Sequence, residues 1–333
     1  LDVEKMQEVF YSEEYLSEKS YEVIEEYLAK LKENGLIGLG LNNVGMPLGK
    51  GYEQITSSYR YKINEDKVVV EDIHKSEVYQ LYIKKMSEWY QKGYIRADVL
   101  SAQPENDNGR EGGNVIWFDQ TWMGAQENDS KKYGMDITVI PMQEYYFIPY
   151  NAPAGGNAIS ATCQYPEVAI KFLELMNSEK GKSIYNLLVY GIENEHYKVI
   201  GEDRIETLDY SGSPTSSSKY GLWKWVVGNA SMAYDTQNEP EGWKEYIFDQ
   251  INEGEDTVKS KLLGFAPDLT SIETKLAQVN AVASEYSEVL VSGSVENYEE
   301  HYNTFMDRLE KAGNDEIVAE LQRQVDEFLA SKE

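Results

Sequence analysis

Aromatic and polar side chains gather in two loops that follow predicted strands. Asp119, Gln120 and Trp122 come after a strand predicted over 114–118, and Tyr150 and Asn151 end an aromatic run after a strand predicted over 137–140. Ligands of open α/β sheets bind beyond the carboxyl ends of strands. Rings there can stack on a flat apolar face, while carboxylate and amide groups pair with hydroxyl groups. This mixture predicts a site for a hydroxyl-rich ligand such as a sugar, although core packing of Trp122 is equally consistent with the sequence.

A second group of candidates is the pair Trp223 and Trp225. Rings two residues apart point to opposite faces of a strand, or lie far apart around a helix. One ring can therefore be buried while the other is exposed to a cleft, and the spacing does not say which. The chain holds 26 Tyr and 6 Trp. Such rings suit a surface that binds polar molecules by stacking, but a single Tyr more often packs on a helix with its hydroxyl group in water.

The sequence predicts no catalytic residue, no metal ligand and no cofactor. His74, His196 and His301 lie far apart and in no recognisable motif, so surface positions are expected for all three. A single cysteine, Cys163, excludes an intramolecular disulfide and a zinc site built on cysteines. The glycines of 45–51 are spaced wrongly for a phosphate-binding loop, and the acidic loop at 105–114 lacks the ligands of a calcium loop. Carboxylates are numerous, so a glycosidase pair is not excluded by counting.

The charge balance of the chain argues against two classes of binding partner. The 333 residues include 58 Asp and Glu against 31 Lys and Arg, which gives a formal charge of −27. Phosphate binding needs Lys and Arg to neutralise the phosphates, so this balance argues against nucleic acid and against anionic membrane surfaces. No apolar stretch approaches about 18 residues, the length that spans a membrane. The sequence begins at Leu1 without a signal peptide, so a trimmed or processed piece is expected.

Apolar periodicity and turn residues predict helices and strands in an order typical of an α/β lobe followed by helices. Ser17 or Ser20 and Ser76 can cap two early helices, which Gly35 and Gly93 can end. The predicted helices cover residues 17–34, 76–92, 166–176, 184–189, 240–253, 271–291, 295–312 and 315–331. The predicted strands cover 36–41, 114–118 and 137–140, and 67–71 is expected to be a short strand or one arm of a hairpin.

Four stretches carry a resemblance to a known family. They are residues 89–98 (WYQKGYIRAD), 158–173, 185–197 (YNLLVYGIENEHY), and 225–229 (WVVGN) with 262–265. With these motifs the chain resembles the extracellular solute-binding proteins of ABC importers, the sugar-binding type. It is most similar to a subgroup of Firmicutes lipoproteins whose C-terminal region carries a domain of unknown function. Asn194 stands where the family often has glycine, which alters only a turn.

The resemblance implies a periplasmic-binding-protein-like α/β fold of type II, here a second lobe with a helical C-terminal region. Residues 1–265 are expected to form the ligand-binding lobe with its hinge-crossing segments, and residues 266–333 a helical region that packs at the hinge. The implied protein is a monomer without enzymatic activity. It would capture an oligosaccharide outside the cell and deliver it to the permease subunits of the importer. A lipidated N-terminus, absent from this chain, would attach it to the cell membrane.

The resemblance also bears on the candidate residues. Asp119, Gln120 and Trp122 stand at the strand-to-helix position where the family often contacts its ligand. Three further functions remain consistent with the sequence. The same scaffold could bind a peptide or another small polar solute, with Arg96 or Arg110 facing a charged group. The chain could be a glycoside hydrolase, or its C-terminal helices could bind a partner protein through an exposed apolar stripe on residues 315–331.

Overall fold

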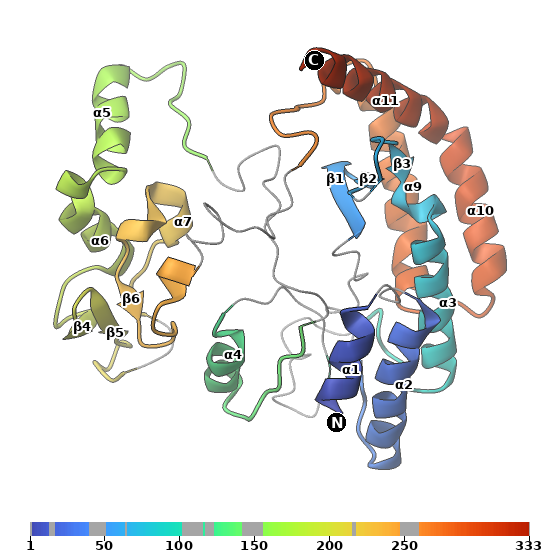
Figure 1. The fold of residues 1–333 in the computed structure, drawn as a ribbon, viewed down its shortest axis with the longest axis horizontal. Coiled ribbons are helices and arrows are strands. Elements are labelled where there is room, and N and C mark those ends of the chain that lie inside the picture. The colour runs from blue at the N-terminus through green and yellow to red at the C-terminus, as the bar shows by residue number, and fades with distance from the viewer. Residues whose placement is uncertain are drawn as a thin grey trace. The chain divides into compact units, whose positions relative to one another are not determined.

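The computed structural model describes residues 2–12, 17–39, 51–63, 65–101, 116, 123–141, 156–214, 218–246 and 260–332 (Figure 1). The chain divides into two compact units. Unit 1 comprises Leu1–Thr121, Ile140–Asn151 and Val258–Glu333, and unit 2 comprises Trp122–Val139 and Ala152–Thr257. The C-terminal residues thus belong to the same compact unit as the N-terminal ones. The predicted domains, 1–265 and 266–333, were defined by their expected roles, whereas the two units are defined by their compactness. The predicted division therefore stays a prediction.

Unit 1 combines helices with a small antiparallel sheet whose strand order is β1-β2-β3. The strands are β1 (Tyr52–Thr56), β2 (Tyr59–Lys62) and β3 (Glu71–Asp72), and a 3-10 turn, η3 (Ile73–Lys75), follows β3. The helices are α1 (Val3–Phe10), α2 (Glu18–Glu33), α3 (Glu77–Gln91), α9 (Glu273–Val291), α10 (Tyr298–Lys311) and α11 (Asn314–Ala330).

Local signals fix the early helices of unit 1 as the sequence predicts. The Ser17 hydroxyl accepts a hydrogen bond from the backbone of Lys19 at the start of α2, and Ser76 does the same for Tyr79 at the start of α3. Each serine satisfies a backbone N–H group that has no partner within the helix. Beyond the two helices, Gly35 and Gly93 adopt φ of 75° and 69°, which glycine reaches without steric cost.

The core of unit 1 joins the N-terminal helices and the sheet to the C-terminal helices. Leu28, Met86 and Phe305 lie in one cluster of buried residues and are 0% exposed. The apolar stripe of α11 lies in the same cluster, since Ile317 and Leu321 are also 0% exposed. The stripe is therefore core, and α11 lacks the exposed apolar surface that would have favoured a partner-binding role for these helices.

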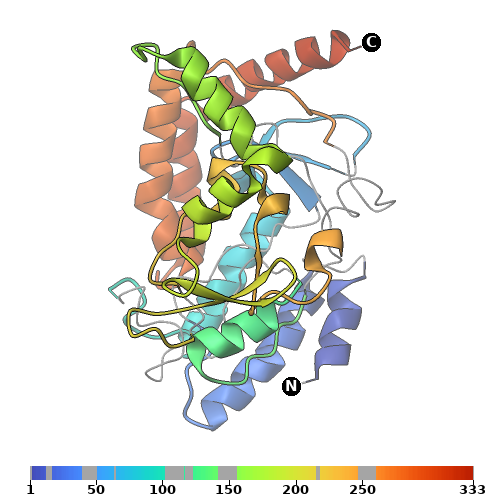
Figure 2. The same cartoon turned by 90° about the vertical axis from the view of Figure 1, so that its left-hand side faces the viewer.

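Unit 2 is built from short helices and a three-stranded sheet of order β4-β5-β6, visible in Figure 2. Its strands are β4 (Tyr197–Gly201), β5 (Arg204–Thr207) and β6 (Asp235–Thr236). Its helices are α4 (Ala125–Tyr133), α5 (Pro166–Met176), α6 (Lys182–Tyr190) and α7 (Lys224–Val227), with the 3-10 turns η5 (Glu179–Gly181) and η6 (Ala230–Met232). β4 and β5 are antiparallel, and β6 runs parallel to β5.

The core that the described residues of unit 2 form is small. Among them, one cluster holds eight buried residues, of which Met176, Tyr185 and Ile205 are 0% exposed. Most of α5 contributes little to it, because Val168 is 64% exposed and Phe172 46% exposed. Since little apolar burial is available, polar contacts must supply more of the local order in this unit.

The strand predicted over 137–140 is wrong, and the one predicted over 67–71 is found only at Glu71, the first residue of β3. The reason is the same for both. Ile137–Ile140 forms no strand: the backbone N–H of Ile137 bonds to the Ser130 hydroxyl, and that of Val139 bonds to the Gln126 amide oxygen, both on α4. Residues 68–70 form no strand either, because Gln322 of α11 bonds both to the Val70 N–H and to the Val68 carbonyl. Helix side chains thus take the place of a neighbouring strand.

The other predicted elements are mostly found. Within residues 36–41, Leu39 forms isolated parallel bridges with Ile95 and Ile116 but no continuous strand is present over the described residues 36–39. The helix predicted over 240–253 is helical at 243–246, and residues 247–253 lie outside the described part. No helix in the described ranges is long and apolar enough to cross a membrane.

Candidate functional site

Two of the seven predicted site residues, Trp223 and Trp225, belong to the described part of the chain. Asp119, Gln120, Trp122, Tyr150 and Asn151 lie outside it, so their role stays a prediction. Trp223 caps the N-terminus of α7 and is 63% exposed, whereas Trp225 lies within α7 and is 45% exposed. The spacing of the two rings did not determine which is buried, and in the structure neither is. Large exposed indole rings are uncommon on a soluble surface and mark a candidate contact site for a ligand.

Contacts from three segments hold the backbone of α7 in place. The Tyr185 hydroxyl of α6 donates to the Lys224 carbonyl at 2.6 Å, and the Asn157 amide donates to the Val226 carbonyl at 2.9 Å. Burial raises the pKa of Tyr185 to about 12, so this hydroxyl group remains a donor at neutral pH. At the end of α7 the chain approaches α5 closely: a Cβ atom on Gly228 would lie 2.2 Å from the Met176 carbonyl oxygen.

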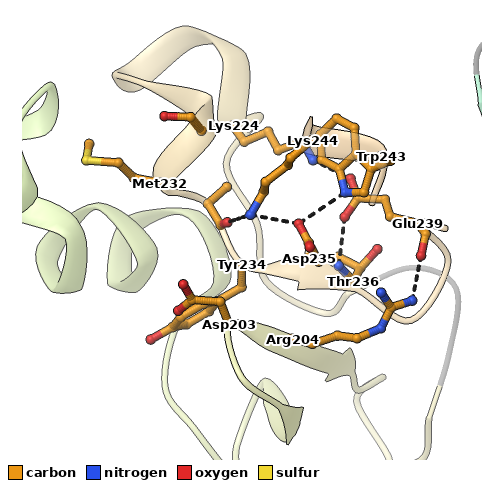
Figure 3. A network of polar contacts seen from close by, with 12 residues as sticks. Asp203, Arg204, Lys224, Met232, Tyr234, Asp235, Thr236, Glu239, Trp243 and Lys244 are labelled. Carbon is orange, nitrogen blue, oxygen red and sulfur yellow. Dashed lines mark hydrogen bonds and ion pairs between the residues drawn. The ribbon is translucent and has the colours of Figure 1, made fainter. Parts of the chain in front are cut away.

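Lys224 connects α7 to the segment that follows β6 (Figure 3). Its ammonium group lies 4.1 Å from the ring centroid of Trp243 and 5.7 Å from that of Trp225, and it forms an ion pair with Glu239. The side chains of Lys224 and Glu239 are only 13% and 22% exposed. A cation over an indole face is favoured most when water is excluded, so this arrangement fixes both rings.

The same segment is pinned by further polar contacts, drawn in Figure 3. The Glu239 carboxylate accepts a bond from the Thr236 N–H at 2.7 Å, and its carbonyl accepts from the Arg204 guanidinium of β5. The Trp243 indole N–H donates to Asp235 at 3.0 Å, and the same carboxylate pairs with Lys244 at 2.7 Å.

Trp225 is therefore held by neighbouring side chains while part of its ring remains in solvent, and we call such a ring braced. Its plane meets that of Trp243 edge-on, with centroids 6.4 Å apart and an interplanar angle of 71°. Trp243 itself is 6% exposed and acts as the buried support. Because 45% of the Trp225 side chain still meets solvent, the indole can offer an apolar face without losing its orientation. Such a face matches the C–H surface of a sugar ring.

The supporting residues Lys224, Glu239 and Trp243 were not predicted from the sequence. The W-K-W motif marks the two candidate rings without showing which is exposed, and nothing in it shows that Lys224 contacts a third tryptophan 18 positions after Trp225. A Pro-Glu-Gly turn before Trp243 was the available local signal, since such a turn can bring a segment back onto a preceding helix.

The carboxylates of this region take part in ion pairs and hydrogen bonds that hold the structure. Asp235 and Glu239 each pair with a lysine and accept a further hydrogen bond. A hydrolase needs two carboxyl groups available to the substrate across a cleft, whereas each of these carboxylates is paired with a lysine. Among the described residues no cluster of three or more His, Cys, Asp or Glu could hold a metal ion.

Two residues bear on the alternative functions: His74 on catalysis by a histidine, and Arg96 on the binding of a charged solute. The surface position expected for His74 is wrong: the residue is 7% exposed, its ring lies 2.8 Å from Asp72, and it packs edge-on against Phe305. Arg96, a candidate partner for a charged solute, is bound by both oxygens of Asp98. Arg110 lies outside the described residues.

Comparisons with known proteins agree with this architecture. The family model described as "Domain of unknown function (DUF3502)" matches residues 261–330, which hold α9, α10 and α11. Over 326 residues the chain is 22% identical to a carbohydrate ABC transporter substrate-binding protein of Streptococcus pneumoniae serotype 4 (strain ATCC BAA-334 / TIGR4). The match covers 94% of this chain and 63% of that protein, so the chain spans somewhat less than two thirds of its relative's length.

Solved structures give the same answer for the fold. The crystal structure of the N-glycan transport solute binding protein (NgtS) from Streptococcus pneumoniae matches with a TM-score of 0.74 at 20% identity, covering 94% of this chain and 68% of that one. NgtS in complex with Man5GlcNAc matches with a TM-score of 0.67 at 20% identity over the same shares. The chain has the solute-binding-protein fold. The predicted α/β fold of type II is thereby confirmed, and so is the resemblance on which it rested.

Trp223 and Trp225 are the two predicted site residues in the described part of the chain, and both lie in unit 2. Both side chains are exposed, and Trp225 is also supported by Lys224 and Trp243.

Proposed function

We propose that this chain belongs to the solute-binding component of an ABC importer that captures an oligosaccharide outside the cell and delivers it to the permease subunits. The likeness to a carbohydrate ABC transporter substrate-binding protein supports the transport role. The observation that favours a carbohydrate among possible solutes is the exposed, braced ring of Trp225, since an indole face can stack on the apolar C–H face of a sugar ring.

The protein acts by binding without reacting. Two lobes close on the solute, and the ligand favours the closed state through the additional contacts that it makes there. Attachment to the membrane through a lipidated N-terminus and a monomeric state are part of the same proposal. Asp119, Gln120, Trp122, Tyr150 and Asn151 are proposed as further ligand contacts, with hydrogen bonds from the carboxylate and amides to sugar hydroxyl groups.

Calorimetric titration with Man5GlcNAc and a panel of neutral oligosaccharides tests the proposal, on this chain and on a full-length version. We expect binding that weakens roughly 10-fold or more in Trp225→Ala, because one stacking contact is lost, and less in Trp223→Ala. Tyr210→Ala is the matched control, since Tyr210 is an aromatic residue of unit 2 that is 88% exposed. Equal affinity in all three variants would refute the role of the tryptophans.

The same samples separate the competing functions. Binding of peptides but no oligosaccharide would assign the scaffold to another solute. Release of reducing sugar during the titration would identify a glycoside hydrolase, and the sugar-transport proposal would then be wrong.

A further inference from the structure

An exposed amide side chain holds the end of the helix that carries Trp225. Asn157 is exposed, and its Nδ2 group donates a hydrogen bond to the Val226 carbonyl at 2.9 Å. The two residues are 69 positions apart in the sequence, and both belong to unit 2. Val226 directly follows Trp225, and consecutive Cα atoms lie about 3.8 Å apart. The Asn157 amide therefore lies beside the turn of α7 from which the braced ring projects.

The bond to Val226 fixes which way the amide of Asn157 points. A backbone carbonyl only accepts hydrogen bonds, so the amide nitrogen must face it, and the amide oxygen then points away. Among the described residues, neither this oxygen nor the second N–H of the amide has a partner. Asn157 thus offers one oriented acceptor and one oriented donor at an exposed position.

A second asparagine of unit 2 shows how an amide with a purely structural role is used. Asn186 is 1% exposed, and its N–H groups donate to the Lys182 carbonyl at 2.9 Å and to the Met232 carbonyl at 2.8 Å. Its oxygen accepts the backbone N–H of Tyr234 at 2.8 Å. All of its bonding groups are engaged within the protein, whereas Asn157 engages one.

The described chain next to Asn157 leaves room for a ligand. A Cβ atom added at Gly156 would meet no heavy atom within 4 Å, and Ala158 is exposed. A group that binds at the Asn157 amide therefore has no described side chain to displace on these two sides.

We propose that Asn157 is a further ligand-binding residue, whose amide bonds to the hydroxyl groups on the rim of the sugar ring that stacks on Trp225. The inference rests on the proposed function and specifies the ligand more closely. Two neighbouring hydroxyl groups match the amide, because one donates to its oxygen while the other accepts its N–H. The ring bound at α7 is therefore one that keeps two adjacent hydroxyl groups unsubstituted beside its apolar face.

Two substitutions of Asn157 separate ligand binding from support of α7. Asn157→Ala loses both functions, whereas Asn157→Asp keeps an acceptor for sugar hydroxyl groups but replaces the bond to Val226 with repulsion between oxygens. Ligand binding predicts that affinity falls about 5-fold in Asn157→Ala and no more than about 2-fold in Asn157→Asp. Support of α7 alone predicts the reverse order, with the aspartate variant the weaker.

Calorimetric titration measures this order, with Man5GlcNAc or with the neutral oligosaccharide of the panel that binds the wild-type protein most tightly. A neutral probe is insensitive to the charge that aspartate adds to a chain of formal charge −27. Asn177→Ala is the matched control, because the exposed Asn177 amide donates to the Leu173 carbonyl of α5 at 2.8 Å, on a helix without tryptophan. Its affinity should equal that of the wild type.

The outcomes distinguish this inference from the proposed function. Unchanged affinity in Asn157→Ala, or weaker binding in Asn157→Asp than in Asn157→Ala, would show that the inference is wrong. If Trp225→Ala still weakens binding in that case, the proposed function is retained. A wild-type protein that binds no member of the panel would refute the proposed function, and the role of Asn157 with it.

Discussion

Unit 1 encloses Leu28, Phe305 and Leu321 completely, whereas unit 2 leaves Val168 and Phe172 of α5 in solvent and orders its 224–244 segment with ion pairs and hydrogen bonds. Apolar burial contributes free energy in proportion to area and tolerates changes of pH and salt. Polar contacts contribute less each, but they are directional and fix the orientation of a ring.

This difference connects each unit with a distinct role. The helices of the C-terminal region complete a continuous core, which suits a stable support. The exposed rings on α7 need orientation more than they need burial, and Lys224 and Glu239 supply it. Substitutions that remove apolar volume should therefore affect unit 1 most, while loss of a charge should affect the geometry of α7.

The largest effect is expected for Leu321→Ala. Leu321 is 0% exposed on α11, so the variant loses transfer free energy and leaves a cavity, a cost of about 2–5 kcal/mol. Leu187→Ala on α6 is the matched control, because Leu187 is 49% exposed. Hydrogen exchange should rise in α9–α11 for Leu321→Ala and remain unchanged in both units for Leu187→Ala. Equal protection in the two variants would contradict the assignment of the main core to unit 1.

Gly228→Ala should perturb α7 by steric contact. The added Cβ would meet the Met176 carbonyl oxygen at 2.2 Å, and backbone cannot yield as a side chain can, so we expect a loss of about 2–3 kcal/mol. Gly221→Ala is the control, since its nearest atom would lie at 3.7 Å and its φ is not positive. Chemical unfolding followed by tryptophan fluorescence measures both, and an unperturbed Gly228→Ala would show that α7 does not pack against α5 in this way.

Lys224→Met tests the polar support of Trp225. The variant keeps the length of the side chain but leaves Glu239 without its cation, at a cost of about 1–2 kcal/mol for this partly buried pair. Iodide should then quench Trp225 more strongly, because the ring gains freedom. In Lys275→Met the lost pair with Glu316 is exposed, with side chains 40% and 66% accessible, and should cost about 0–1 kcal/mol. Equal quenching in both variants would show that Lys224 does not orient the ring.

Helices were predictable because their signals are local. Ser17, Ser76, Gly35 and Gly93 act within one turn of the helix that they begin or end, and apolar spacing shows the buried face. Burial of that face depends on the rest of the fold: the stripe predicted on α11 is core, but the comparable residues Val168 and Phe172 of α5 are exposed.

The strand predictions that failed, over 68–70 and 137–140, show the limit of local sequence signals. The Val68–Val70 run has the composition of a strand, yet its backbone bonds to the side chain of Gln322, 252 residues further along the chain from Val70. No pattern within the run contains this partner. The site has the same limit. The W-K-W motif marked two candidate rings without showing that both are exposed, and the contact of Lys224 with Trp243 depends on how the chain folds back after β6.

The smallest effect is expected for an ion pair on the surface of unit 1. Hydrogen bonds from Arg323 and Gln324 lower the pKa of Glu320 to about 2, from an ordinary value of 4.5. A lowered pKa means that the folded state favours the carboxylate. Its contribution to stability is therefore complete above the ordinary value and is lost as the pH falls from about 4.5 through about 2. Carbon-13 NMR of the Glu320 carboxyl group measures the midpoint directly.

Arg323→Gln should move that midpoint toward the ordinary value, because the first and largest cause of the shift is removed. Salt on the order of 1 M, where the Debye length is about 3 Å, should move it in the same direction. The partly buried pair of Lys224 and Glu239 should respond much less to the same salt, since water and ions have little access to it. Two outcomes would contradict the distinction between an exposed pair on the surface of unit 1 and a shielded pair that orients a ring in unit 2. One is a Glu320 midpoint near 4.5 at low salt. The other is iodide quenching of Trp225 that rises with salt as steeply as the Glu320 midpoint.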